Sequence, residues 1–289
     1  MYSLRSTEDL SDPERLFRLS PDDVRLLNPN TGTCPIFRTR RDAEITKAIY
    51  RRVPVLIDEA KGEEGNAWDV SFLRMFDMAN DSGLFRTRPQ LEAGGWELNG
   101  NVFARGAERY LPLYEAKMVH HFNHRFGDYA MKDEDSESTA LPEVPIERLQ
   151  NPGYMPLPRY WVPAAEVGAR LEARGGRQWL LGWRDICRSA DERTVIAGAI
   201  PCVGVGHKFL LAAPKKQQGA FALLANLTTF AFDYVARQKT GGTSLGYFVF
   251  KQLPVVGPTS YSGAAPWQLD TALAGWIGTQ WQFGFTVNG

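Results

Sequence analysis

The sequence predicts an α+β fold, with mixed strands around one buried helix in its second half and a smaller α/β region before it. The apolar runs at 179–183, 194–200 and 208–211 are short enough for strands. Residues 220–237 carry apolar side chains nearly all round a helix, which predicts that this helix is buried. Acidic residues, serines and six prolines fill the stretch 131–163, and that composition is typical of a linker.

The elements before this linker are short. A helix is expected up to Arg52, with Asp42 as its N-terminal cap and apolar residues at near-helical spacing. Residues 53–57 predict a brief strand, and 68–78 predict a packed segment rich in aromatic residues. Gly and Asn between 93 and 101 predict a loop.

The elements after the linker are more regular. A helix is expected to begin at or just after Pro163 and to end at Gly175–Gly176. Gly241–Gly242 closes the helix at 220–237, and 245–250 then predicts a strand. The resulting domain boundaries are 1–130 for a connector or partial N-terminal region, 131–162 for the linker, 163–260 for the main domain and 261–289 for a tail of unclear structure.

Composition restricts the class of protein. The 289 residues are 44% hydrophobic, and they contain no run of eighteen apolar residues, so no membrane partner is expected. Met1–Arg5 leads into polar residues without an apolar signal core. Cys34, Cys187 and Cys202 form no CxxC pair, which argues against a disulfide framework or a zinc cluster. We expect a cytoplasmic protein.

The charges are unevenly distributed, although the net charge is zero. Residues 165–260 hold 12 Lys and Arg against 6 Asp and Glu, a balance of +6. Residues 1–164 hold 21 against 26, a balance of −5, and Asp270 supplies the remaining charge. Such an asymmetry points to a polyanionic partner, although a mixed charged surface is the ordinary alternative.

Three enzyme motifs are incomplete. Glu115, His120, His121 and His124 are metal-ligand types, but His121 stands where the HExxH pattern requires the glutamate base, so a hydrogen-bonded histidine cluster is the better interpretation. Residues 151–154, Asn-Pro-Gly-Tyr, are similar to the Asn-Pro-Pro-Tyr motif that holds a flipped adenine, with a proline-rich turn as the alternative. Residues 58–61 offer the acids and lysine of a nuclease, in a charged loop.

A basic and polar set lies on loops next to the predicted strands. Arg and Lys neutralise phosphates, and Arg and Gln pair with the edges of bases. We expect Lys208 and Lys239 to contact phosphate, and Arg184, Arg193 or Gln238 to reach bases. Solvated turns are the alternative, with a salt-linked turn at 191–193. The predicted DNA-binding residues are Arg184, Arg188, Arg193, His207, Lys208, Arg237, Gln238, Lys239, Thr243 and Ser244.

Several ordered motifs resemble one protein family. The matching residues are 110–118, 124–126, 184–188, 191–197, 200–201, 230–238, 242–245 and 250–254. They are similar to the C-terminal, TaqI-like target-recognition region of type II G and related restriction–modification adenine methyltransferases, and to the stretch just ahead of it. The resemblance covers roughly residues 25–258.

The resemblance implies a sequence-specific module that binds double-stranded DNA. The family's catalytic part, which binds S-adenosylmethionine, precedes this region, so no cofactor and no catalytic residue are expected here. The chain would then be a fragment, a split subunit or a decayed gene product. The alternatives are a methyltransferase or nuclease with an unrecognised site, and a specificity subunit that docks onto a separate catalytic chain through Trp68, Phe72 and Phe76.

Overall fold

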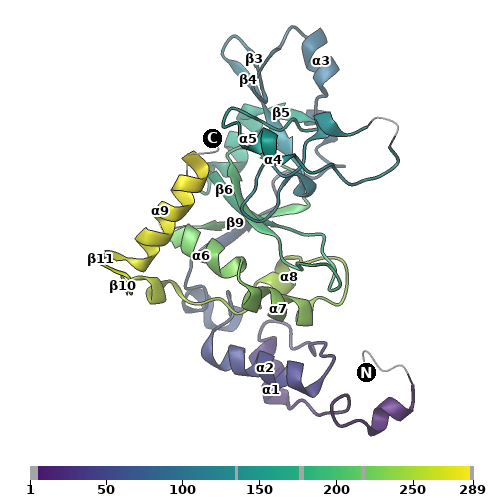
Figure 1. Ribbon diagram of the computed structural model, residues 1–289, viewed down its shortest axis with the longest axis vertical. Helices are drawn as coiled ribbons and strands as arrows, with labels where there is room; N and C mark the ends of the chain where they lie inside the picture. The colour runs from purple at the N-terminus through teal and green to yellow at the C-terminus, as the bar shows by residue number, and fades with distance from the viewer. Residues whose placement is uncertain (1–5, 134–135, 176–178, 216–218, 287–289) are drawn as a thin grey trace. The chain divides into compact units, whose positions relative to one another are not determined.

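The computed structural model describes residues 6–133, 136–175, 179–215 and 219–286 (Figure 1). The chain divides into two compact units. Unit 1 comprises Met1–Val70, Ile186–Val195 and Lys216–Ile277, and unit 2 comprises Ser71–Asp185, Ile196–Lys215 and Gly278–Gly289. Helices and mixed sheets are both present, so the predicted α+β class is confirmed.

A four-stranded sheet in the order β1-β9-β6-β7 forms the centre of unit 2. Strand β6 pairs antiparallel with both β7 and β9, and its residues 180–183 are buried, as expected for a strand covered on both faces. Gly182 is required there, because a Cβ atom would lie 2.5 Å from the Leu210 carbonyl oxygen. The strands are β1 (Val70–Leu73), β6 (Trp179–Arg184), β7 (Ala197–Pro201) and β9 (Phe209–Pro214).

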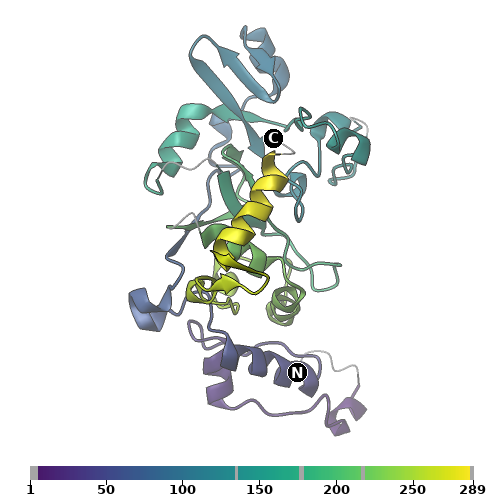
Figure 2. The ribbon, with the colours of Figure 1, turned by 60° about the vertical axis from the view of Figure 1, so that its left-hand side comes forward.

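A second sheet of unit 2 has the order β2-β3-β4-β5, and β8 pairs in parallel with β4. Strands β3 and β4 form an extended hairpin next to α3 (Figure 2). The elements are α3 (Arg88–Ala93), β2 (Glu97–Asn99), β3 (Val102–Arg105), β4 (Glu108–Tyr114), α4 (Ile146–Leu149), β5 (Trp161–Pro163), α5 (Ala164–Glu172) and β8 (Gly204–Val205), with 3-10 turns η3 (Ser82–Leu84), η4 (Ala116–Met118) and η5 (Tyr129–Met131).

The core of unit 2 joins segments that lie far apart in the sequence. Phe76, Tyr114, Val162 and Phe209 are buried together in one cluster. Residues 136–162 of the predicted linker belong to this unit, where Val144 and Trp161 are buried. The assignment of functions to the predicted domains stays a prediction.

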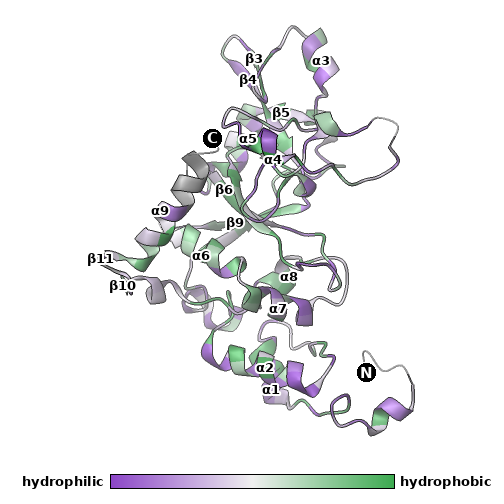
Figure 3. Cartoon of the chain, in the orientation of Figure 1, coloured by the Kyte–Doolittle hydropathy of each residue, from purple (hydrophilic) through white to green (hydrophobic). Residues whose placement is uncertain are grey.

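Unit 1 is built mainly from helices. Helix α2 is amphipathic and buries Ala43, Thr46 and Tyr50 (Figure 3). The helices and strands outside unit 2 are η1 (Glu8–Ser11), α1 (Pro21–Leu27), α2 (Arg40–Arg52), η2 (Glu59–Gly65), α6 (Ala220–Leu227), α7 (Phe230–Lys239), α8 (Tyr247–Phe250), η7 (Pro258–Tyr261), β10 (Ala264–Ala265) and β11 (Gln268–Ala272), followed by α9 (Leu273–Thr286), which extends past the end of unit 1.

Four local predictions for unit 1 need correction. The helix at 220–237 is two helices, because Thr229 caps α7 by accepting a hydrogen bond from the Phe232 amide at 3.2 Å. Residues 247–250 form a helical turn and not a strand. Thr39 is the N-terminal cap of α2, with Asp42 as the reciprocal capping residue. The predicted strand at 53–57 forms only a single bridge, Val55 to Pro254.

Candidate nucleic-acid interface

Two predicted DNA-binding loops of unit 1 lie side by side. The Cys187 amide donates a hydrogen bond to the Thr243 carbonyl oxygen at 3.1 Å. Ile186 and Ser244 form an antiparallel bridge next to it. Residues 186–195 and 240–244, which we call the paired loops, therefore form one continuous surface although about fifty residues separate them in sequence.

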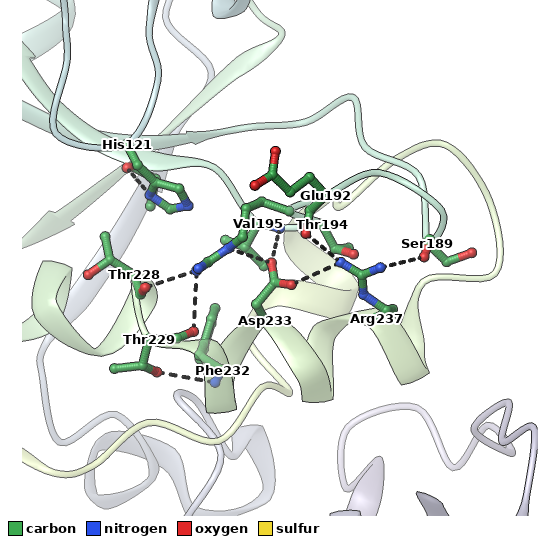
Figure 4. Close-up of polar contacts among 12 residues, drawn as sticks. His121, Ser189, Glu192, Thr194, Val195, Thr228, Thr229, Phe232, Asp233 and Arg237 are labelled. Atoms are coloured by element: carbon green, nitrogen blue, oxygen red, sulfur yellow. Dashed lines mark hydrogen bonds and ion pairs between the residues drawn. The ribbon is translucent and has the colours of Figure 1, made fainter.

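The carboxylate of Asp233 fixes the base of the paired loops. Asp233 lies on α7 with 5% of its surface exposed, and its Oδ1 accepts a hydrogen bond from the Val195 amide at 2.8 Å. Its Oδ2 lies 3.2 Å from Arg237 Nη2, one helical turn further on (Figure 4). Arg193 Nε lies 3.5 Å from Oδ1. A buried carboxylate with these partners holds loop and helix together.

Arg237 and Arg193 are braces inside unit 1. Arg237 donates to the carbonyl oxygens of Ser189 at 3.0 Å and Glu192 at 2.9 Å (Figure 4). Arg193 donates to the Thr228 carbonyl oxygen at 2.9 Å, and its guanidinium lies 4.8 Å from the centre of the Phe230 ring. These donors satisfy backbone oxygens that no helix or strand would satisfy. The expected contact between Arg193 and a base is therefore not supported.

The paired loops expose a small polar set. Arg188, Glu192, Thr243 and Ser244 are exposed. Asp191 has a local role, since its Oδ2 accepts a hydrogen bond from the Arg188 amide at 3.0 Å. Of the ten predicted residues, Arg188, Thr243 and Ser244 come together on one solvent-facing surface of unit 1.

The expected contact between Lys239 and phosphate is not supported, since Lys239 is half-buried and Gln238 beside it is buried. Lys239 Nζ donates to Leu27 O, to Asn28 Oδ1 at 2.7 Å and to Gln252 O at 2.9 Å. An ammonium group has three donors, and all three have acceptors inside unit 1. Burial lowers the pKa of Lys239 well below its ordinary value. Lys239 therefore ties α7 to the ends of α1 and α8.

The other three predicted residues belong to unit 2. Arg184 is half-buried and donates from Nε to the Val119 carbonyl oxygen at 2.8 Å, and burial lowers its pKa to about 10. The exposed Lys208 lies 2.8 Å from the buried carboxylate of Asp185. His207 Nδ1 accepts a hydrogen bond from a backbone amide at 3.1 Å. Only Lys208 presents a charged group to solvent, and its charge is already paired.

The histidine cluster forms a turn and not the helix that HExxH requires. His120 and Asn123 pair across the turn, and His121 Nδ1 lies 3.1 Å from the Ala197 carbonyl oxygen. Burial lowers the pKa of His124 to about 4, and the charge of Arg125 lowers it further in the same direction. No three His, Cys, Asp or Glu side chains gather as metal ligands in the part of the chain that the structure describes.

Residues 151–154 form a closed turn. Asn151 Oδ1 accepts a hydrogen bond from the Gly153 amide at 2.9 Å. The Tyr154 hydroxyl donates to the buried carboxylate of Asp128, and the buried Arg125 donates to the carbonyl oxygens of Asn151 and Tyr154. The groups that would grip an adenine are therefore bound within the protein, which supports the turn interpretation.

The structure also bears on the nuclease residues at 58–61 and on the aromatic residues suggested for docking. Asp58 pairs with Lys61 at 2.9 Å, while Glu59 pairs with Lys251 at 2.5 Å, so these acids face different partners. Trp68 and Phe76 are buried, and Phe72 packs edge-on against Trp183. Trp68 and Phe76 are therefore core residues, while Phe72 is half-buried. No helix among the described residues is long and apolar enough to cross a bilayer.

Asp233 is the residue that sequence reasoning missed. The pattern of 220–237 predicts an apolar, buried helix and does not single out its one acid. The available signal was Arg237 four residues later, because Asp and Arg at that spacing face each other on a helix. The partner amide of Val195 gives no signal in the sequence.

Comparison with protein-family models, with characterised proteins and with solved structures finds no match to this chain.

Replacing Asp233 with Ala is expected to lower the free energy of unfolding by about 3 kcal/mol, because two arginines lose their buried partner. Chemical denaturation followed by circular dichroism measures the change. The matched control is Asp270→Ala, since Asp270 is exposed, and we expect a change within about 0.5 kcal/mol. Equal losses in both variants would contradict the bracing role.

Lowering the pH from about 6.5 to about 4 is expected to destabilise the chain through His124. The folded-state pKa lies below the unfolded one, so this stability is complete above pH 6.5 and is lost as the pH falls toward 4. A shift of this size corresponds to about 3 kcal/mol. Denaturation of wild type and His124→Gln across this window measures it, and parallel stability profiles would count against the assignment.

Proposed function

We propose that this chain is the sequence-specific DNA-recognition part of a restriction–modification adenine N6-methyltransferase. The proposal rests on the contact between the paired loops, where the Cys187 amide donates a hydrogen bond to the Thr243 carbonyl oxygen. Asp233 holds the first of these loops through the Val195 amide. Loops held by a rigid scaffold are the usual carriers of binding residues. The motifs at 184–188, 191–197 and 242–245, on which the family resemblance depends, overlap these loops.

The exposed side chains have the chemistry of direct base readout. Arg188 can donate two hydrogen bonds to the O6 and N7 atoms of guanine, and Glu192 can accept one from the N4 amino group of cytosine. Thr243 and Ser244 can contact either bases or phosphates. Gly241 and Gly242 let backbone amides approach a phosphate closely. The paired loops thus offer both specific and positioning contacts within unit 1.

In this proposal, S-adenosylmethionine and methyl transfer belong to a catalytic part that works together with this chain, and a cytoplasmic location fits a duplex-DNA partner. A methyltransferase or nuclease site within the chain has less support. Residues 151–154 are closed by Arg125 and Asp128, and the acids at 58 and 59 bind separate lysines. Docking onto a separate catalytic chain is compatible with DNA recognition, but the buried Trp68 and Phe76 do not provide the surface.

Replacing Arg188 with Ala is expected to weaken binding to the preferred duplex by about 1–3 kcal/mol if Arg188 reads a base. If it contacts phosphate, binding weakens on every duplex and the salt slope falls by about 0.9. Fluorescence anisotropy with labelled duplexes at several salt concentrations separates the two cases.

The matched control is Arg52→Ala, which removes another exposed arginine at the end of α2 in the same unit. Both variants should keep the melting temperature of wild type, because neither side chain is buried. The paired loops would not be the DNA surface if wild type, Arg188→Ala and Arg52→Ala had the same DNA affinity and the same salt slope.

A further inference from the structure

An open cavity of about 660 Å³ lies within unit 2, and the proposed function uses none of its lining residues. Its lining residues include Leu157, which is half-buried, and the buried Pro158 and Trp161. Four cationic side chains line it as well, from α3, from the segment after β4, from the end of η5 and from the segment before β5. They are Arg88, Lys117, Lys132 and Arg159.

Two of these cations are held by neighbouring acids. Lys117 Nζ donates to the Thr139 carbonyl oxygen at 2.9 Å and lies 3.8 Å from Glu115 Oε2. Arg88 Nε lies 2.7 Å from Glu92 Oε1 on the same helix. Both side chains therefore already have a partner within the protein, although exposed ion pairs of this kind are weak.

The other two cations, Lys132 and Arg159, have no ion pair among the described residues. The Arg159 guanidinium lies 5.0 Å from the centre of the Tyr160 ring, which covers one of its faces, and its side chain is exposed. Lys132 is half-buried at the end of η5. Asp133 is the one acid among the lining residues that the structure describes.

Tyr129 also lines this cavity. Its hydroxyl donates to Glu115 Oε1 at 2.6 Å. Burial raises the pKa of Tyr129 above its ordinary value, and the bond to Glu115 acts in the same direction, so the hydroxyl stays protonated. The ring therefore remains neutral, with the ammonium of Lys117 5.0 Å from its centre.

We propose that this cavity binds the phosphate group of a nucleotide, with Arg159 and Lys132 as the phosphate ligands. An arginine fork matches phosphate oxygens, and a lysine adds a point charge. The half-buried Leu157 and Tyr129 offer apolar contacts to the sugar or base, and the volume falls within the range of small-molecule sites. The phosphate belongs either to a free nucleotide or to a DNA strand. The inference does not rest on the proposed function.

Binding of ATP, measured by calorimetry, and of a short random-sequence duplex, measured by anisotropy, tests the site on the full chain. We compare wild type with the double variant Lys132→Gln/Arg159→Gln and with the single variant Arg159→Gln. The matched control is Arg109→Gln, in β4 of the same unit, whose Nη1 bonds to the Gly106 carbonyl oxygen at 2.7 Å. Melting curves confirm that each variant folds.

We expect the double variant to bind ATP at least about tenfold more weakly than wild type. The affinity of the single variant should lie between the two, and Arg109→Gln should match wild type. If wild type binds only the duplex, and the double variant loses that affinity, the phosphate belongs to DNA. No binding of either probe, or equal binding by wild type and double variant, would overturn the site. Arg188→Ala should leave ATP binding unchanged, so failure of one proposal is distinguishable from failure of the other.

Discussion

The carboxylate of Asp233 is the group on which the arrangement of the paired loops depends. It lies buried on α7, 2.8 Å from the Val195 amide, and two arginines lie beside it. Those arginines in turn satisfy carbonyl oxygens of residues 189, 192 and 228. A loop with no regular hydrogen bonding of its own is thereby held to a helix, and the buried carboxylate is paired with two arginines.

This arrangement separates two kinds of polar residue that look alike in the sequence. Arg193, Arg237 and Lys239 point inward and bind backbone oxygens, so they contribute to stability. Arg188, Thr243 and Ser244 remain outside, on loops that Arg237 and the Cys187–Thr243 bond hold in place. A rigid loop presents its side chains with little loss of conformational entropy on binding, which favours specific recognition.

Much of the fold follows from local pattern. The class, the strands at 179–184 and 209–214, and helices α2 and α5 were predictable, because apolar periodicity and capping residues act over a few positions. The break at Thr229 was not, because a capping threonine competed with a long apolar run. Residues 245–250 have β-forming side chains, yet they turn into a helix where Phe250 and Leu253 are buried.

The candidate site was predictable as loops but not residue by residue. Charge and turn composition identified 184–194 and 237–244, and the structure joins parts of these loops. Which arginine faces inward depends on the carbonyl oxygens and the carboxylate that tertiary packing brings to it. Lys239 shows this clearly, since its acceptors at residues 27, 28 and 252 lie far away in sequence.

The most direct test of DNA recognition is selection of the purified chain on a pool of randomised duplexes at two salt concentrations, with sequencing of the retained DNA. We expect an enriched sequence motif and retention that falls steeply between about 50 and 200 mM salt, because salt weakens the phosphate contacts. Retention without a motif, and without dependence on salt, would contradict it.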